Sequence, residues 1–357
     1  MSLLLRHTVL RRVVTIPSLL VLLVLCAALL VPVVVVSGLV GSRPGGRARA
    51  ARIAIFAVIY MVAEVVGLVC AGRLWIRAAF GRHIGTQRHQ DAHYVLLGRL
   101  LDRLYQVGSA LFALRIDPPR SVAGGGVAGH GAAIPPLPPT PGRPLLVLSR
   151  HAGPGDSFLL VYALLAPVHR RPRIVLKQTL VMDPLIDVVL SRLPHCYIAP
   201  GEAEGDRATS EIRDLSRTLG PADALLVFPE GGNFTRQRRV RVIASLRRRG
   251  LMRATARAQR MRNVLPPQPA GVFAAIDAAP HADLVFVAHT GLDHLQSVGQ
   301  VWRGLPLTRT VEVTWWIVPT EQVPSEQDAR HRWLDDNWTR IDAWISRSQD
   351  ADWLESS

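Results

Sequence analysis

The chain has 357 residues, of which 42 are Lys or Arg and 27 are Asp or Glu, so its formal net charge is +15 at pH 7. That length accommodates a membrane anchor and one substantial domain. The positive charge favours an anionic partner such as nucleic acid, anionic lipid or a phosphorylated substrate. Aromatic residues make up only 6% and no basic helix alternates with stacking rings, so we expect no nucleic-acid binding.

The cysteines and histidines give no sign of a metal centre or a disulfide framework. Cys26, Cys70 and Cys196 show no metal-ligand spacing, and Cys26 and Cys70 lie inside apolar segments. The 12 histidines are scattered, and no close pair has an acidic third ligand at matching spacing. We therefore expect neither a metal nor a bound cofactor.

Residues 1–85 are predicted to form a membrane anchor with two apolar helices. Residues 19–36 carry no charge, a length that suits a bilayer span of about 20 residues and is too long for a signal-peptide core. A second apolar run at 53–72 carries Glu64. Arginines precede, separate and follow the runs, so their count does not distinguish a transmembrane hairpin from a re-entrant one. The basic remainder of the chain favours a cytoplasmic main domain, with the cell inner membrane as the expected location.

Residues 86–143 connect this anchor to the rest of the chain. Apolar residues at helical spacing predict an amphipathic helix over 86–110. Residues 112–116 are predicted to be a first strand. The Gly- and Pro-rich tract at 117–143 is predicted to be a surface loop.

From Pro144 the pattern alternates between apolar runs and helical stretches. This alternation predicts an α/β core over 144–320, with a mostly parallel sheet flanked by helices. Residues 321–357 are predicted to form a C-terminal amphipathic helix and tail. The expected strands are 145–149, 173–177, 196–199, 224–228, 283–288 and 311–317, and the expected helices are 156–166, 183–192, 206–218, 241–261 and 327–345.

The most informative polar pair follows the strand expected at 145–149. His151 stands at its carboxyl end and Asp156 at the start of the next helix, with a Gly/Pro turn between them. Parallel sheets usually place their chemistry at this edge. A carboxylate so placed fixes the imidazole tautomer and stabilises the imidazolium that forms when a general base takes a proton. The alternative is a surface histidine beside a helix-capping aspartate.

A second polar loop follows the strand at 224–228, on the same edge of the sheet. It reads Glu230-Gly231-Gly232, and Arg236 heads an arginine-rich stretch just beyond it. Glycines let backbone N–H groups approach a phosphate or an oxyanion, whereas the alternative is an ordinary turn beside a solvated or lipid-facing arginine cluster. Lys177, the only lysine in the chain, ends a third expected strand and is a candidate phosphate ligand.

Together these motifs resemble the glycerolipid acyltransferase family, which includes 1-acylglycerol-3-phosphate acyltransferases. The family's His-x-x-x-x-Asp motif matches His151 and Asp156, and its Phe-Pro-Glu-Gly-Thr motif matches residues 228–232. The segment around Lys177 is also similar. Phe-Thr at 234–235, Leu-x-Pro-x-x-x-Gly at 265–271 and a Trp-rich helix at the C-terminus are similar to the lysocardiolipin-acyltransferase-like branch. The resemblance covers about residues 90–346 and implies a glycerol-phosphate-acyltransferase-like fold.

The resemblance also implies a reaction. His151, oriented by Asp156, would activate the free hydroxyl of a lysophospholipid, most simply 1-acylglycerol-3-phosphate, for attack on the thioester of acyl-CoA or acyl carrier protein. Glu230 would help bind the acceptor and the Gly231–Gly232 amides would steady the oxyanion. This chain departs from the family at two places: Gly232 replaces a threonine, and Asn233 replaces an arginine that often contacts the phosphate. Arg236 or Lys177 would take that role, or the acceptor is another, lysocardiolipin-like lysolipid. The expected partners are therefore acyl-CoA, a lysophospholipid and a bilayer with anionic lipids.

Two further interpretations compete with acyl transfer. Gly-Asp-Ser at 155–157 imitates a lipase motif with Ser157 as nucleophile, and Asp328 and His331 imitate its distal pair. Its internal Gly-x-Asn-Asp block is missing from the sequence, and Asp328 falls in the tail helix. A non-catalytic lipid-binding relative is the other alternative, which Gly232 and Asn233 permit.

Overall fold

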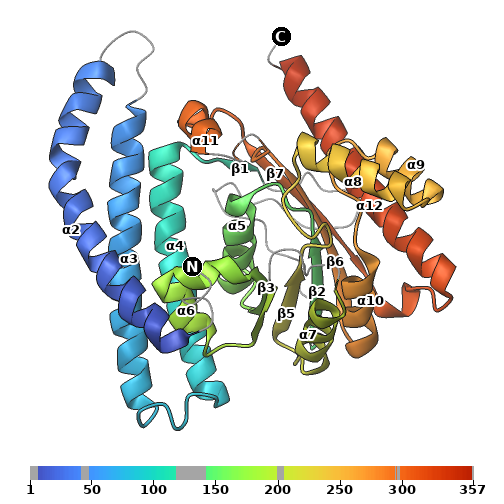
Figure 1. Ribbon diagram of the computed structural model, residues 1–357, viewed down its shortest axis with the longest axis horizontal. Helices are drawn as coiled ribbons and strands as arrows, with labels where there is room; N and C mark the ends of the chain where they lie inside the picture. The colour runs from blue at the N-terminus through green and yellow to red at the C-terminus, as the bar shows by residue number, and fades with distance from the viewer. Residues whose placement is uncertain are drawn as a thin grey trace. The chain divides into compact units, whose positions relative to one another are not determined.

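The computed structural model describes residues 7–41, 48–117, 142–198, 205–293, 295 and 298–355 (Figure 1). The chain divides into two compact units. The first contains Met1–Leu114, Leu176–Pro200 and Trp302–Arg309, and the second contains Arg115–Val175, Gly201–Val301 and Thr310–Ser357. The sequence analysis divides the chain into four consecutive segments, and that division stays a prediction.

The first unit is built around three long helices that pack side by side, α2 (Thr8–Gly41), α3 (Arg49–Arg77) and α4 (Gln87–Phe112) (Figure 1). The two apolar helices and the amphipathic helix predicted from the sequence are thereby confirmed. Both α2 and α3 are long and apolar enough to cross a membrane. The strand predicted at 112–116 is wrong, because α4 continues through Phe112 and β1 covers only Ile116–Asp117.

Shorter elements complete the first unit, and buried ion pairs tie them to the long helices. They are η1 (Gln178–Met182), α6 (Pro184–Leu190) and β4 (His195–Ile198). Asp187 of α6 accepts hydrogen bonds from Arg11, at 2.6 Å, and from Arg12, at 2.8 Å. Glu64 of α3 accepts a hydrogen bond of 3.0 Å from the backbone N–H of Leu185. The carboxylate inside the second apolar run is therefore paired with the start of a helix.

The second unit is a sheet whose strands lie in the order β1-β7-β6-β2-β5-β3. All neighbours are parallel except β6 and β7, so the predicted mostly parallel α/β sheet is confirmed. Every residue of β2, β5 and β6 is buried, which explains why these strands appear in the sequence as short continuous apolar runs. The strands are β2 (Leu145–Ser149), β3 (Arg171–Lys177), β5 (Asp223–Val227), β6 (Asp283–Thr290) and β7 (Val311–Val318).

Helices flank the sheet, and several of them differ from the helices predicted from the sequence. The helix predicted at 241–261 is two helices, separated at Gly250, whose φ of 70° suits glycine. The helices that begin at Pro269 and at Val298 were not predicted. The flanking helices are α5 (Pro154–Leu165), α7 (Asp206–Arg217), α8 (Arg236–Arg248), α9 (Met252–Arg260), α10 (Pro269–Ala278), η2 (Thr320–Gln322) and α12 (Gln327–Glu355). The division between the two units falls within α11 (Val298–Gly304). Nearly all of the predicted Gly/Pro-rich loop lies outside the described residues.

Candidate active site

The turn from β2 into α5 fixes Asp156. Gly153 is the N-cap residue of α5 and Asp156 stands at its third position. Its carboxylate accepts hydrogen bonds from the backbone N–H groups of Ala152, at 2.6 Å, and Gly153, at 3.1 Å. These donors are the unsatisfied N–H groups of a helix start, where a negative charge is also favoured by the helix dipole.

His151 lies against this carboxylate. Its Nδ1 is 3.0 Å from Oδ1 and 3.2 Å from Oδ2 of Asp156, and its ring stacks on Phe228 with centroids 4.4 Å apart. Because a carboxylate only accepts, Nδ1 carries the proton and Nε2 of the neutral ring is an acceptor. Among the residues that the structure describes, nothing bonds to Nε2. The geometry required of an oriented general base is therefore present.

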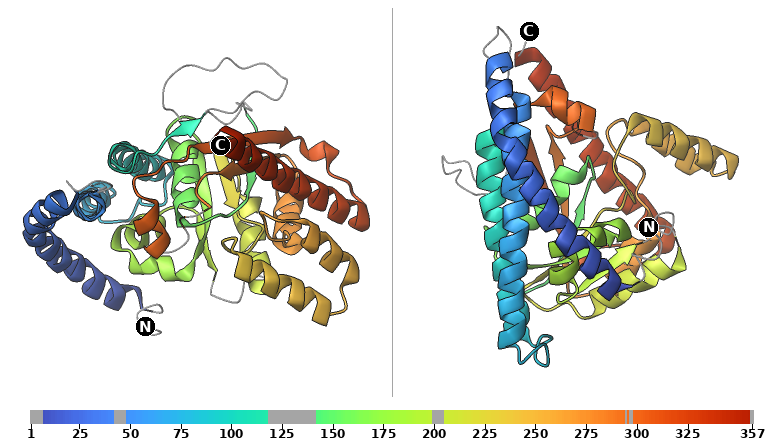
Figure 2. Two further views of the ribbon diagram at one scale, coloured as in Figure 1. Left: turned by 90° about the horizontal axis from the view of Figure 1, so that it is seen from above. Right: turned by 60° about the vertical axis from the view of Figure 1, so that its left-hand side comes forward.

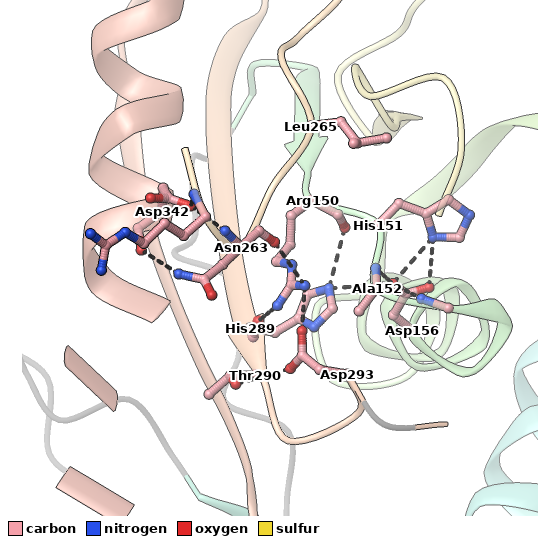
Figure 3. Close-up of polar contacts among 12 residues, drawn as sticks. Arg150, His151, Ala152, Asp156, Asn263, Leu265, His289, Thr290, Asp293 and Asp342 are labelled. Carbon is pink, nitrogen blue, oxygen red and sulfur yellow. Dashed lines mark hydrogen bonds and ion pairs between the residues drawn. The ribbon is translucent and has the colours of Figure 1, made fainter. Parts of the chain in front are cut away.

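A second imidazole lies beside the same carboxylate, as Figure 3 shows. His289, near the end of β6, places Nε2 at 3.5 Å from Oδ2 of Asp156 and 3.2 Å from the backbone oxygen of Arg150. Both neighbours are acceptors, so this nitrogen also carries a proton. Burial lowers the pKa of His289, with Arg150 adding to the effect, and the ring is neutral. Sequence analysis missed His289, although a polar pair at the end of an apolar strand is a detectable signal.

The charge state of Asp156 follows from its surroundings. Burial alone would raise the pKa of this carboxyl group. The hydrogen bond from His151, the proximity of His289 and the backbone N–H of Gly153 outweigh burial, and its pKa lies below the usual value. Asp156 is therefore ionised, as a residue that stabilises an imidazolium must be.

Arg150, which precedes His151, holds the surrounding loops together. Its side chain is fully buried and pairs with Asp293 at 2.5 Å. It also donates to the backbone oxygens of His289, at 2.7 Å, and Asn263, at 3.3 Å (Figure 3). The segment at Asn263 is bound in turn by Asp342 of α12. One guanidinium thus joins the ends of β2 and β6 to the segment that precedes α10.

Glu230 lies at the centre of the site, but it faces the chain's own backbone. Its carboxylate accepts from the N–H of His151, at 3.0 Å, and from the N–H of Leu265, at 2.8 Å. Burial raises its pKa to about 8, although Arg150 and these two N–H groups act in the opposite direction. The sequence-based prediction gave Glu230 to the acceptor. In the structure both of its oxygens accept backbone N–H groups and so join the two polar loops, and a role of Glu230 in acceptor binding stays a prediction.

The glycine loop is shaped by an arginine that sequence analysis did not single out as a ligand. Gly231 adopts a φ of 65°, and the N–H of Phe234 donates to the backbone oxygen of His151 at 2.6 Å. The guanidinium of Arg238 folds back onto the backbone oxygen of Gly231, at 3.1 Å. It occupies the space that a Cβ on Gly232 would need. This packing explains why a residue larger than glycine does not fit the present arrangement.

The two cations predicted as phosphate ligands are both exposed. Arg236 is the first residue of α8 and is exposed, whereas Arg238 is the arginine that lies on the glycine loop. Lys177 is the exposed last residue of β3 and belongs to the first unit. The role of each as a phosphate ligand stays a prediction.

An apolar cavity opens beside Asp156 and His289. Its volume is about 510 Å³, including the space open to solvent. Apart from those two residues, its walls are aliphatic and aromatic side chains from α5, β6, β7 and their neighbours. The wall residues are Ile116, Leu159, Leu160, Ala163, Val287, Leu292, Val311, Val313 and Trp315. The Asp156 carboxylate and the His289 ring thus border a cavity suited to an apolar ligand.

The alternative serine site is not assembled in the same way. Ser157 donates to Asp156 at 3.3 Å, whereas Asp328 and His331 lie on α12, where the His331 ring contacts Phe273. Within the described part of the chain, no hydrogen bond joins Ser157 to Asp328 or His331. The structure therefore shows no serine–histidine pair here.

Comparison with known proteins agrees with the motifs. Residues 131–284 match the family model Acyltransferase, and this range contains His151, Asp156, Glu230 and the glycine loop. Residues 131–284 of the chain therefore carry a domain that matches the acyltransferase family model. The comparison does not identify a branch within it. No curated protein and no solved structure matches the chain.

Proposed function

We propose that this protein is a membrane-bound O-acyltransferase that moves a fatty acyl group from acyl-CoA or acyl carrier protein to the hydroxyl of a lysophospholipid. The acceptor we favour is 1-acylglycerol-3-phosphate, which would yield phosphatidic acid. The observation that carries the proposal is the His151–Asp156 pair, with Nε2 available beside a glycine loop. We place the enzyme at the cell inner membrane with its catalytic unit in the cytoplasm, as the basic charge favours.

The reaction follows from the protonation states of the site. Nε2 of His151 takes the hydroxyl proton as the oxygen attacks the thioester carbonyl, and Asp156 stabilises the imidazolium. The tetrahedral oxyanion accepts a hydrogen bond from the glycine loop, for which the N–H of Gly232 is the candidate, because the N–H of Gly231 donates to the backbone oxygen of Phe228 at 3.1 Å. When the intermediate collapses, the C–S bond breaks and the imidazolium returns the proton to the leaving thiolate. The ester product and the free thiol account for every atom, and no acyl-enzyme forms.

The apolar cavity supplies the environment that an acyl chain needs. Each methylene transferred from water to an apolar site is worth about 0.8 kcal/mol, so a long chain stays in the bilayer unless the protein offers an equivalent surface. The cavity borders Asp156 directly, which is the position that a donor chain needs if its thioester is to reach His151. We assign the cavity to the acyl chain.

The acceptor phosphate requires a cation near the glycine loop. Arg238 supports this role because its guanidinium already contacts Gly231, and a planar guanidinium binds phosphate oxygens in pairs. Arg236 and Lys177 remain candidates for additional contacts. A lysolipid with another head group, as in lysocardiolipin acylation, is the alternative acceptor.

The decisive test uses purified protein in detergent or vesicles, labelled acyl-CoA and a panel of lysophospholipids, with products identified by mass spectrometry. His151→Ala is expected to lower kcat/KM by at least 10²–10⁴-fold, and Asp156→Asn by a similar factor, because base catalysis is typically worth that much. Ser157→Ala serves as the matched control and should retain activity. Release of free fatty acid by the wild type, together with loss of that activity in Ser157→Ala, would identify a hydrolase. Lipid binding without transfer to any acceptor would identify a non-catalytic relative.

A further inference from the structure

The most highly charged part of the chain is the helical hairpin α8–α9. Residues 236–262 contain 11 arginines and no Asp, Glu or Lys. Eight of these side chains are exposed, and within the described residues none of the eight has an acidic partner. They are Arg236, Arg241, Arg247, Arg248, Arg249, Arg253, Arg260 and Arg262. Such a concentration of unpaired positive charge requires a polyanionic partner to offset its self-repulsion.

The hairpin is attached along one helix and presents the other outward. Thr255 and Ala258 of α9 are buried, and Arg257 pairs with Asp335 of α12 at 2.7 Å. Arg239 of α8 donates to the backbone oxygens of Met261, at 2.6 Å, and Gln259, at 2.8 Å. No residue of α8 is buried. Figure 2 shows the hairpin projecting from the rest of its unit, so α8 and the connecting turn are accessible.

The connecting turn carries the second feature. Leu251 and Met252 are 42% and 66% exposed, and Val240 of α8 is 64% exposed. The turn reads Arg-Arg-Arg-Gly-Leu-Met-Arg over 247–253, so exposed apolar side chains are bracketed by four cations. Arginines that meet lipid phosphates around a small apolar tip are the arrangement of a surface that inserts shallowly into an anionic bilayer.

We propose that the α8–α9 hairpin is a second membrane-docking element, which binds anionic phospholipid head groups through its arginines and inserts Leu251 and Met252 between them. A nucleic acid is the poorer partner, because residues 236–262 include no aromatic ring for base stacking. An acidic carrier protein would match the charge but would leave the apolar tip in water. A lipid surface satisfies both features.

Docking here would act close to the glycine loop. Thr235 caps α8 by accepting from the N–H of Arg238 at 3.0 Å, and the Arg238 side chain contacts Gly231. A hairpin held at the head-group layer therefore brings the loop to the surface in which a lysophospholipid resides. The docking surface goes beyond the proposed reaction, and its existence does not depend on that reaction.

The test is a spectroscopic depth measurement on the full chain. In a background with Cys26, Cys70 and Cys196 replaced by alanine, an environment-sensitive fluorophore is attached to Met252→Cys, and the protein is reconstituted in vesicles. We expect the label to be quenched by lipids brominated on the acyl chain when the vesicles contain phosphatidylglycerol. In phosphatidylcholine vesicles, we expect quenching to be weak. The same label on Ala270→Cys, an exposed site on α10, should stay in water in both.

Matched variants separate the contributions. Arg247→Gln/Arg248→Gln/Arg249→Gln should weaken tip insertion about a hundredfold in its equilibrium, since each arginine near an anionic surface contributes about fivefold. Arg207→Gln/Arg213→Gln/Arg217→Gln on α7 removes the same charge from an exposed helix and should leave insertion intact. Leu251→Ser should weaken the quenching of the label on Met252→Cys, because it removes the apolar neighbour that inserts with it.

Three results would overturn the docking proposal: a label that stays in water in both vesicles, equal insertion with and without anionic lipid, or a response only to an acidic carrier protein. The depth signal needs no substrate, so it also separates the two proposals. An inactive enzyme with an inserted tip would contradict acyl transfer alone. An active enzyme with an aqueous tip would contradict docking alone.

Discussion

Asp156 lies between two imidazoles, and the second of them gives it a property that a two-residue motif lacks. The Nε2–H of His289 donates to the backbone oxygen of Arg150, at 3.2 Å, and Nε2 lies 3.5 Å from Oδ2 of Asp156. This N–H dipole points its positive end at the carboxylate and so weakens the negative potential at the His151 ring. His289 touches neither substrate nor reacting atom in the proposed reaction and is a positioning residue.

Removing the donor at His289 should therefore change the pH dependence of the reaction. For His289→Leu we expect kcat/KM at neutral pH to fall about fivefold, which corresponds to about 1 kcal/mol, and the acidic limb of its pH profile to move to higher pH. The shift follows because the unopposed carboxylate holds a proton on His151 more firmly. His289→Gln, which keeps an N–H donor, should restore the wild-type profile. An unshifted pH profile in His289→Leu would show that His289 contributes only to packing.

The same histidine should make folding stability depend on pH. Its pKa is lowered in the folded protein by burial, whereas in the unfolded chain it is about 6.5. As the pH falls through about 6.5 the unfolded state gains a proton that the folded state does not take, so stability is lost on the acid side. The melting temperature in detergent should thus fall more steeply below that pH for the wild type than for His289→Gln. Parallel curves would contradict a buried neutral imidazole.

Gly232 and Arg238 should act as a pair. In Gly232→Ala the new Cβ displaces the Arg238 guanidinium, a flexible chain end, so we expect little change in melting temperature. If Arg238 binds the acceptor phosphate, the KM for 1-acylglycerol-3-phosphate should rise about tenfold in Gly232→Ala and in Arg238→Gln. The double variant should be no worse than either single variant, whereas additive losses would show that the two residues act separately. Monoacylglycerol, which lacks the phosphate, is the control acceptor.

At the scale of elements, the prediction agrees best with the structure where an element is encoded by residues close together in the sequence. β2 and β5 are buried parallel strands with continuous apolar runs, and their predicted bounds lie within a residue of the structure. The predicted single helix at 241–261 fails because Gly250 breaks it, while arginines on both sides hide the break in a uniform pattern. The start of α10 was not recognised because it lies in a proline-rich segment, and proline occurs both in loops and at the first position of a helix.

In the candidate site, too, contacts between residues close in sequence could be predicted, whereas contacts between distant residues could not. His151 and Asp156 are five residues apart on one turn, so their spacing alone predicts the contact. The partners of Glu230 are the N–H groups of His151 and Leu265, on other loops, and the position of His289 depends on β6 lying next to β2. No local pattern encodes such pairings. They follow from the order of strands in the sheet, which the sequence analysis did not predict.

The apolar cavity between α5 and the sheet is the element whose size we expect to set acyl-chain selectivity. Ala163 of α5 lines the cavity and is 4% exposed, so the larger side chain in Ala163→Leu would fill part of the cavity. We expect kcat/KM for long-chain acyl-CoA to fall about tenfold or more, because a methylene of misfit costs about 1–3 kcal/mol, while a short-chain donor is spared. Leu159→Ala, on the same wall, should favour longer chains. An equal loss for all chain lengths would place the acyl chain elsewhere.

At the scale of the whole molecule, the N-terminal helices differ in what surrounds them. Apolar side chains are exposed along nearly the whole of α2, from Val9 to Leu39. By contrast, α3 contacts polar groups of its own unit along its length. Arg52 donates to the backbone oxygen of Leu111, Glu64 accepts from the N–H of Leu185, and the backbone oxygen of Ala71 accepts from Arg192. If α3 crossed a bilayer, α4 and the start of α6 would have to enter the hydrocarbon beside it, where charged groups are costly.

These contacts favour a re-entrant hairpin that enters one leaflet with α2 facing lipid, so both ends of α2 should lie on the side of the catalytic unit. In the cysteine-free background, Ser42→Cys reports the link between α2 and α3, and Ala270→Cys reports the second unit. A membrane-impermeant maleimide should label both from the cytoplasmic face of vesicles and neither from the opposite face. Labelling of Ser42→Cys only from the face opposite Ala270→Cys would establish a transmembrane hairpin. The contacts of α3 would then lie within the bilayer, where interhelical pairing, and not lipid exposure, satisfies Glu64.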